Sequence, residues 1–264
     1  MIEHVVKQGS VEWHTLRSVI PTASNFDRLI TPAKWEPTKG DTRRGYQLEL
    51  LANRIFGLPD ELAGVSALAH GREWEPIARA AYQFQHGVEI QDAGFFTDDA
   101  ERYGASPDGL IGDDGLVEFK NPESPKVHLA ALMDSLKYQE YSALVRNWTA
   151  LSVSGSEITG FMRDHWAQVQ GQLYVTGRAW CDLVCNFARL PMVVVRIYRN
   201  PVYIGILSAA LDAFCADMAD LEAKAKANGW LKERTPMVMA GPMGDLAITD
   251  DDVERLLAAR RAAQ

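Results

Sequence analysis

Apolar and polar residues alternate along this chain with two different periods, and each period predicts one kind of element. Helical spacing of the apolar residues appears at 23–30, 46–56, 68–85, 164–176 and 208–227. Strand-like runs of apolar and β-branched residues appear at 88–96, 109–112, 116–120, 179–187 and 192–198. This order of elements predicts an α/β (α+β) fold in which a central mixed sheet is flanked by helices.

Capping and breaking residues indicate where some of these helices begin and end. Thr22 or Ser24 can cap the first helix, and Pro76 is expected to interrupt the helix at 68–85. After the long final helix, Gly and Pro open a tail whose acidic start and basic end suit a short helix. We therefore expect a single domain over residues 1–240 and a tail with a short helix at 241–264.

A hairpin is predicted where two strand-like runs flank the sequence Gly-Asp-Asp-Gly at 112–115, since glycine and aspartate tolerate positive φ. Alternation along the second run sends Glu118 and Lys120 to the same face. Asp108 joins that face only if the loop has an odd length or a bulge, because one residue of slip turns every side chain over. We expect this geometry, with Gly115 as the left-handed residue.

Two carboxylates and a lysine on one strand face can hold Mg²⁺ against a phosphodiester. Carboxylates are hard oxygen ligands that suit a hydrated Mg²⁺ ion and the phosphate oxygens that it binds. Lys120 cannot bind a metal while it is protonated, but it can hold the attacking water and screen charge on the phosphate. Glu118 beside it favours the charged form, which argues for water positioning rather than for a free base.

Composition is that of a globular protein, with 264 residues, 47% hydrophobic and 23% charged. There is no uninterrupted apolar run long enough to span a bilayer and no signal-peptide pattern, so we expect a cytoplasmic protein without membrane contact. The cysteines, Cys181, Cys185 and Cys215, form no disulfide framework, and Cys181 and Cys185 lie among apolar residues that indicate a core role.

The net charge of −8 argues against a protein that coats nucleic acid nonspecifically. It leaves room for a DNA enzyme whose basic residues gather in one channel. A candidate basic strip runs through Lys34, Lys39, Arg43 and Arg44, and a solvated loop explains the same residues equally well.

Four segments occur in a recognisable order along the chain. They are Trp-His-Thr-Leu-Arg at 13–17 with Thr-Ala-Ser at 22–24, Gly-Arg-Glu-Trp-Glu at 71–75, the hairpin, and Ala-Gln-Val-Gln-Gly-Gln-Leu-Tyr at 167–174. Together they resemble the YqaJ-type viral recombinases, or lambda-type exonucleases, a family of PD-(D/E)XK nucleases. The resemblance implies a restriction-endonuclease-like core with helical N-terminal and C-terminal elaborations.

The resemblance also implies residues that bind the DNA end. Arg17, Ser24 and Ser106, with Thr22 beside them, would form a pocket for the terminal 5′ phosphate. Leu68 matches an apolar residue that the family wedges into the duplex end, although burial in a helix would also explain it. Lys34 is the candidate DNA contact on the basic strip.

For the metal, the resemblance implies Asp108, Glu118 and Glu75, with the backbone carbonyl of Phe119 as a further ligand. Pro76 disfavours helical geometry at the residue before it, so Glu73 stays an alternative to Glu75.

The helix at 164–176 offers two candidate glutamines. Gln168 and Gln170 point about 200° apart on an ideal helix, so they cannot serve the site equally, and both are retained as candidates.

The expected function is an Mg²⁺-dependent 5′-to-3′ exonuclease on linear double-stranded DNA, with two ions and Mn²⁺ able to substitute. It would release 5′ mononucleotides and leave a 3′ single-stranded overhang for phage-type recombination. No P-loop sequence is present, so ATP is not expected. The resemblance also implies a homotrimeric ring and a single-strand annealing protein as partner. Alternatives are a restriction or junction-resolving endonuclease and a noncatalytic DNA-binding protein of the same fold.

Overall fold

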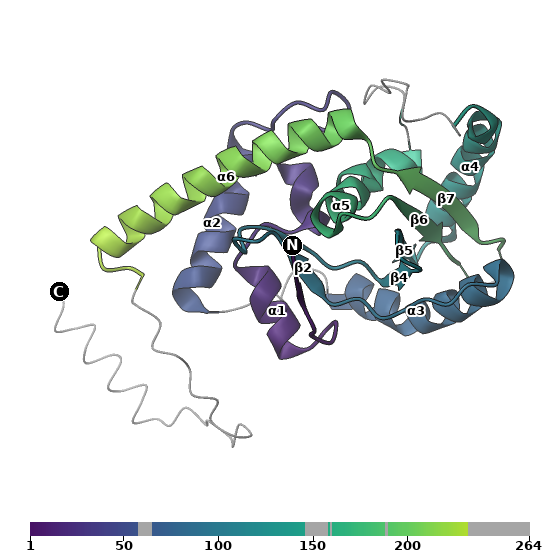
Figure 1. Ribbon diagram of the computed structural model, residues 1–264, viewed down its shortest axis with the longest axis horizontal. Coiled ribbons are helices and arrows are strands. Elements are labelled where there is room, and N and C mark those ends of the chain that lie inside the picture. Colours follow the sequence, from purple (N-terminus) through teal and green to yellow (C-terminus); the bar gives the residue numbers. More distant parts are fainter. Residues whose placement is uncertain (58–64, 146–157, 159, 188–189, 232–264) are drawn as a thin grey trace, which may run out of the picture. The chain divides into compact units, whose positions relative to one another are not determined.

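The computed structural model describes residues 1–57, 65–145, 158, 160–187 and 190–231 (Figure 1). Side chains at 65–72 and 137–145 are outside this description. Residues Met1–Leu231 form one compact unit. The helix expected within 241–264 lies outside the described residues.

The main sheet has four strands in the order β4-β5-β6-β7. The outer pairs are antiparallel and β5 runs parallel to β6, so the expected mixed sheet is confirmed. The strands are β4 Gly109–Ile111, β5 Gly115–Lys120, β6 Trp180–Cys185 and β7 Val193–Tyr198. A second, antiparallel sheet contains β1 Ile2–His4, β2 Phe95–Thr97 and β3 Gly104–Ala105.

Helices surround these sheets in the described part of the chain. They are α1 Val11–Ser18, the 3₁₀ helix η1 Ala23–Arg28, α2 Asp41–Phe56, α3 Val65–His86, α4 Pro125–Val145, α5 Gly160–Thr176 and α6 Pro201–Ala227. Apolar spacing predicts no element at α1 or α4, and the helix predicted at 208–227 begins earlier, at Pro201. Asn200 caps α6 and Pro201 opens it, a start signal that apolar spacing alone does not reveal.

The β4–β5 hairpin has the predicted parity. Ile111 pairs with Gly115, which leaves a loop of odd length at 112–114. The expectation about the left-handed residue is wrong, because Gly112 has the positive φ of 53°. Gly115 is required for another reason: a Cβ there would overlap the indole ring of Trp180 on the neighbouring strand.

The run at 88–96 is not the long strand that its composition predicts. Only a bridge from Gln91 to Leu110 precedes β2. The backbone of Ile90 bonds instead to side chains of α3: its N–H donates to Gln83 Oε1 at 2.7 Å and its carbonyl accepts from Arg79 at 2.9 Å. Side chains thus satisfy a backbone that a neighbouring strand would otherwise pair.

Two other local expectations are corrected. Helix α3 continues through Pro76, since buried Ala78 and Tyr82 anchor it against the sheet and offset the lost backbone hydrogen bond. The segment after Thr22 is a 3₁₀ helix rather than an α-helix, and Thr22 occupies its N-cap position without a side-chain capping bond.

Strand β5 separates two apolar clusters, which fixes where its polar side chains lie. Leu116 belongs to the large cluster shared with α5 and α6. Val117 and Phe119 belong to the smaller cluster with Ala78 and Tyr82 of α3. Glu118 alternates with these residues and therefore shares the α5 side of the sheet with Leu116.

A buried hydrogen bond fastens α3 to the sheet. The Asp182 carboxylate on β6 accepts from the Tyr82 hydroxyl at 2.5 Å and from Arg196 of β7 at 2.7 and 2.8 Å. Asp182 is only 2% exposed, so these donors take the place of water around its carboxylate. The helix that carries Glu75 is thereby held in place.

Helix α6 is long and apolar enough, by length and composition alone, to cross a membrane. Three of its acidic residues instead pair with arginines of other elements: Asp212 with Arg102, Asp217 with Arg43, and Glu222 with Arg54. These contacts and its buried face make α6 a helix of the folded domain.

Gly171 allows α5 to approach η1 closely. A Cβ at this position would overlap the Phe26 ring and press on Ala23. The contact matters for function because the chain entering η1 carries Thr22 and Ser24.

We predict that Gly171→Ala lowers the free energy of unfolding by about 1–3 kcal/mol, because the added methyl overpacks this contact. The matched control is Gly205→Ala on α6, where no atom lies within 4 Å of the new Cβ. There the usual helix preference should raise stability by about 0.5–1 kcal/mol. Urea unfolding measures both changes, and equal stabilisation by the two substitutions would contradict the packing argument.

Candidate active site

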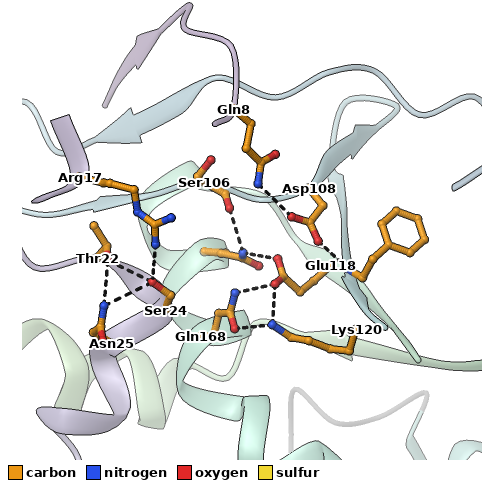
Figure 2. A network of polar contacts seen from close by, with 12 residues as sticks. Gln8, Arg17, Thr22, Ser24, Asn25, Ser106, Asp108, Glu118, Lys120 and Gln168 are labelled. Carbon is orange, nitrogen blue, oxygen red and sulfur yellow. Dashed lines mark hydrogen bonds and ion pairs between the residues drawn. The ribbon is translucent and has the colours of Figure 1, made fainter. Parts of the chain in front are cut away.

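A cavity of about 1640 Å³ lies among α1, η1, α3, β5 and α5. It brings together residues that are far apart in the sequence (Figure 2). Among its lining residues are Arg17, Thr22, Ser24, Glu75, Ser106, Asp108, Glu118, Lys120 and Gln168.

Glu118 lies at the centre of the polar network, with a side chain only 4% exposed. Its Oε1 accepts from Lys120 Nζ at 2.8 Å and from Gln168 Nε2 at 2.6 Å. Its Oε2 accepts from Gln172 Nε2 at 2.6 Å. Lys120 also donates to Gln168 Oε1 at 2.9 Å, so lysine, glutamate and Gln168 hold one another (Figure 2).

Asp108 follows Ser106 and Pro107 just before β4. Its Oδ2 accepts from the Phe119 N–H at 2.7 Å, and its Oδ1 accepts from Gln8 Nε2 at 3.3 Å. Burial raises the pKa of Asp108 well above its ordinary value, and the negative charges of Glu118 and Glu75 add to this effect. Both glutamates are therefore close enough to Asp108 for their charges to act on it.

Lys120 is an ammonium ion in this setting. Burial lowers its pKa, but the negative charges of Glu118 and Asp108 outweigh burial and raise the pKa above the ordinary lysine value. The side chain therefore acts as a charged hydrogen-bond donor, as its place beside Glu118 predicts.

Glu75, rather than Glu73, reaches the cavity from α3. Glu75 contributes to the lining and its charge acts on Asp108, whereas Glu73 is exposed and absent from the lining. The side chain of Leu68, on the first turn of α3, lies outside the described residues.

The carboxylates fit a divalent cation by their chemistry. Asp108, Glu118 and Glu75 supply hard oxygen donors. A cation would offset both the burial of the Asp108 carboxylate, which is the main cause of its raised pKa, and the negative charges of the two glutamates, which add to it. Among the described side chains, no group of three His, Cys, Asp or Glu already converges as in a formed metal site. We therefore assign donors without a coordination geometry, and the Phe119 carbonyl stays a prediction.

A second group of donors lines the same cavity. Arg17 Nη2 donates to Ser24 Oγ at 3.0 Å, and that hydroxyl lies 3.1 Å from Thr22 Oγ1. The Arg17 guanidinium lies 4.1 Å from the centre of the Trp13 ring, whose Nε1 donates to Ser106 Oγ at 2.8 Å. An arginine among hydroxyls is a suitable site for a phosphate.

The candidate basic strip lies apart from this cavity. Lys34, Lys39 and Arg44 are exposed and do not contribute to the lining. Arg43 pairs with Asp217 of α6 at 2.6 Å. The structure thus gives Lys34 no place in the site, and its contact with DNA stays a prediction.

The expectation for Gln170 is corrected. This side chain is fully buried away from the cavity lining, where its Nε2 donates to the Tyr198 carbonyl and its Oε1 accepts from the Asn200 N–H, both at 2.8 Å. The helix rotation that separates Gln168 from Gln170 thus assigns them to different surroundings, and Gln168 is the one in the site.

Sequence reasoning missed two further residues of the lining, Gln172 and Arg79. Gln172 lies four residues after Gln168, and Arg79 four residues after Glu75. Arg79 donates to the Asp108 carbonyl at 3.2 Å and so joins α3 to the loop that carries Asp108. The i, i+4 spacing on a helix face would have found both.

The cysteines have the expected core role. Cys181 and Cys185 are fully buried in β6, and burial raises the pKa of Cys185 to about 12. Cys185 Sγ lies 3.3 Å from His128 Nδ1 in the protein interior. Cys185 is also the residue of β6 that pairs with Lys120 of β5.

Known proteins share this architecture. The YqaJ-like viral recombinase domain matches residues 12–179. An alkaline exonuclease from Laribacter hongkongensis is 28% identical, with a TM-score of 0.63 over 84% of this chain and 100% of its own. The same exonuclease in complex with dAMP has the same identity and coverage and a TM-score of 0.62.

A phage-related exonuclease from Haemophilus somnus 129PT shares the fold, with 13% identity and a TM-score of 0.57 over 80% of this chain and 98% of its own. No curated protein matches the chain significantly.

A mixed sheet that presents an aspartate, a glutamate and a lysine beside a helix-borne glutamate defines a nuclease of the PD-(D/E)XK class. Within that class, the chain belongs to the YqaJ-like viral recombinase domain family, whose pattern covers more than half of its length.

The two glutamines should respond differently to removal. Gln170→Ala leaves the buried Asn200 N–H and Tyr198 carbonyl without this partner, so we expect a loss of about 3 kcal/mol in unfolding free energy. Gln168→Ala should cost less than about 1 kcal/mol, because Lys120 and Glu118 still pair with each other, but it should impair nuclease activity. Urea unfolding and a nuclease assay on the same samples measure this contrast, and the reverse pattern would contradict the assignment.

Proposed function

We propose that the protein is a Mg²⁺-dependent, ATP-independent exonuclease that degrades one strand of linear double-stranded DNA from its 5′ end. A nuclease acting on DNA is the part that the family and the similar alkaline exonuclease support directly. The finer proposal depends on one observation. The carboxylate and lysine cluster and the arginine and hydroxyl pocket line a single cavity, in which Ser106 and Asp108 are two residues apart.

The pocket binds the end of the strand. Arg17, Thr22, Ser24 and Ser106 offer donors to a terminal phosphate, and Arg17 supplies the positive charge. Binding of this phosphate beside Asp108 places the first phosphodiester near the carboxylates, which gives cleavage from a 5′ end.

Asp108, Glu118 and Glu75 would hold the divalent cation. When bound, that cation supplies activation of water and neutralises charge on the phosphate. Lys120 holds the attacking water through its ammonium group and stabilises the negative charge that develops on the phosphate. Gln168 fixes Lys120 in this position, because its carbonyl accepts from Nζ while its amide donates to Glu118.

The products would be 5′ mononucleotides and a 3′ single-stranded overhang. The Laribacter exonuclease has been solved with dAMP, a mononucleotide, and this supports the proposed product. A homotrimeric ring around the duplex would let a protein of net charge −8 stay on DNA by topology rather than by charge. We propose that it works with a single-strand annealing protein in the cytoplasm of the host cell.

Linear duplex labelled at either end tests the polarity. In Mg²⁺, label should leave the 5′ end first, a covalently closed plasmid should stay intact, and ATP should have no effect. Release from the 3′ end first would overturn the polarity, and cleavage of the closed plasmid would favour an endonuclease.

We expect Lys120→Ala to lower kcat on linear duplex by about 10²–10³-fold, since the variant loses a charged donor to the reacting phosphate. Lys224→Ala, which removes an exposed lysine of α6, is the matched control and should leave kcat unchanged. Steady-state release of nucleotides measures both. Full activity of the Lys120 variant would exclude the mechanism.

Arg17→Ala should lower kcat/KM about tenfold or more on 5′-phosphorylated ends, the loss expected for a charge-assisted hydrogen bond. The same variant should degrade ends that carry a 5′ hydroxyl at nearly the rate of the wild-type protein. Arg163→Ala removes an exposed arginine of α5 that does not line the cavity and serves as control. Equal loss on both kinds of end would exclude recognition of the 5′ phosphate by Arg17.

A further inference from the structure

Gln172 contacts the side of Glu118 that Gln168 and Lys120 leave open. It lies on α5, one turn after Gln168, and is only 1% exposed. Its Nε2 donates to Glu118 Oε2 at 2.6 Å, whereas Gln168 and Lys120 both bond to Oε1. The two oxygens of the carboxylate are thus held from different positions along one helix face.

The orientation of the Gln172 amide follows from the chemistry of Glu118. An ionised carboxylate only accepts hydrogen bonds, so the amide must turn its NH₂ group toward Oε2. Its own carbonyl oxygen, Oε1, is then buried without a hydrogen-bond partner. A buried acceptor without a partner opposes folding, so the arrangement indicates that the contacts of Nε2 are worth this cost.

The same nitrogen also reaches the loop before β4. Gln172 Nε2 lies 3.5 Å from the carbonyl oxygen of Ser106. Two residues further along, Asp108 approaches β5 through its bond to the Phe119 N–H. Gln172 therefore spans the gap between Glu118 on the strand and the loop that carries the second carboxylate.

We propose that Gln172 is a positioning residue that sets the orientation of Glu118 relative to the loop of Ser106 and Asp108. By fixing this spacing it prepares the two carboxylates to bind the divalent cation. The proposal rests on the proposed function, because it concerns the metal site of that nuclease. Gln172 itself acts through Glu118 and contacts no reacting group.

Gln168 and Gln172 thereby have separate roles. Gln168 contacts Lys120 as well as Glu118, so its loss disturbs the residue that holds the attacking water. The side-chain bonds of Gln172 go to Glu118 and Ser106, so its loss should act on metal affinity.

This role is tested by titrating the full chain with MgCl₂ in the absence of DNA and measuring the heat of binding by calorimetry. Gln172→Met has a similar length but no donor, and we expect its Mg²⁺ affinity to fall about 10–100-fold, as for other residues that orient metal ligands. The control is Gln47→Met, which removes another buried glutamine that bonds to Asp217 of α6. Its Mg²⁺ affinity should match that of the wild type.

Kinetics on linear duplex provide a second readout. Gln172→Met should have a low kcat at limiting Mg²⁺ that recovers as Mg²⁺ is raised, with the KM for DNA unchanged. A purely structural defect would not be reversed by Mg²⁺. If the methionine variant does not fold, Gln172→Asn keeps the amide but is one methylene shorter, so it should lose the contact with Glu118 and show the same shift.

Three results would overturn the role of Gln172. They are a wild-type Mg²⁺ affinity in a folded Gln172 variant, a kcat that stays low at saturating Mg²⁺, and an equal loss of affinity in Gln47→Met. Each of these results would still be compatible with the proposed nuclease activity. A wild-type protein that binds neither Mg²⁺ nor Mn²⁺ would overturn both the role and the metal-dependent function.

Discussion

The burial of the Glu118 carboxylate is the constraint on which the rest of the site depends. Removing a carboxylate from water is costly unless hydrogen-bond donors of the protein replace the lost water. Those donors come from its own strand, through Lys120, and from α5, through Gln168 and Gln172. Helix α5 must therefore lie close to β5, in the orientation about its own axis that turns Gln168 and Gln172 toward Glu118. Gly171, on a neighbouring part of the same helix, lets α5 pack closely on η1, which brings the hydroxyls of the second pocket to the same cavity.

Helix α3 packs on the opposite face of the sheet. There α3 is held by apolar packing around Val117 and by the bond from Tyr82 to Asp182. Both attachments lie toward the C-terminal end of the helix. Glu75 and Arg79, nearer its start, extend to the cavity and to the Asp108 carbonyl. The side chains of the cavity are thus brought together at β5 by two helices that cover opposite faces of the sheet, so neither helix alone determines the geometry.

Much of this arrangement could be read from the sequence, because hairpin parity and strand alternation are local rules. They placed Asp108, Glu118 and Lys120 together without knowledge of the tertiary fold. Local rules failed where distant side chains decide the outcome. Arg79 and Gln83 satisfy the backbone of Ile90 and replace an expected strand, and packing on the sheet carries α3 through Pro76. The choice between Gln168 and Gln170 likewise depended on which face of α5 meets β5, and apolar spacing alone did not settle that rotation.

Trp13 joins the two walls of the terminal pocket through one aromatic ring. Its face lies against the guanidinium of Arg17 and its N–H donates to Ser106. Fluorescence from an indole depends on a nearby cation and on the hydrogen bond at its nitrogen. An anion that draws Arg17 toward itself alters the first influence on the ring, and one that draws Ser106 alters the second. If a strand terminus binds in this pocket as proposed, the fluorescence of Trp13 would report its arrival, independently of whether hydrolysis follows.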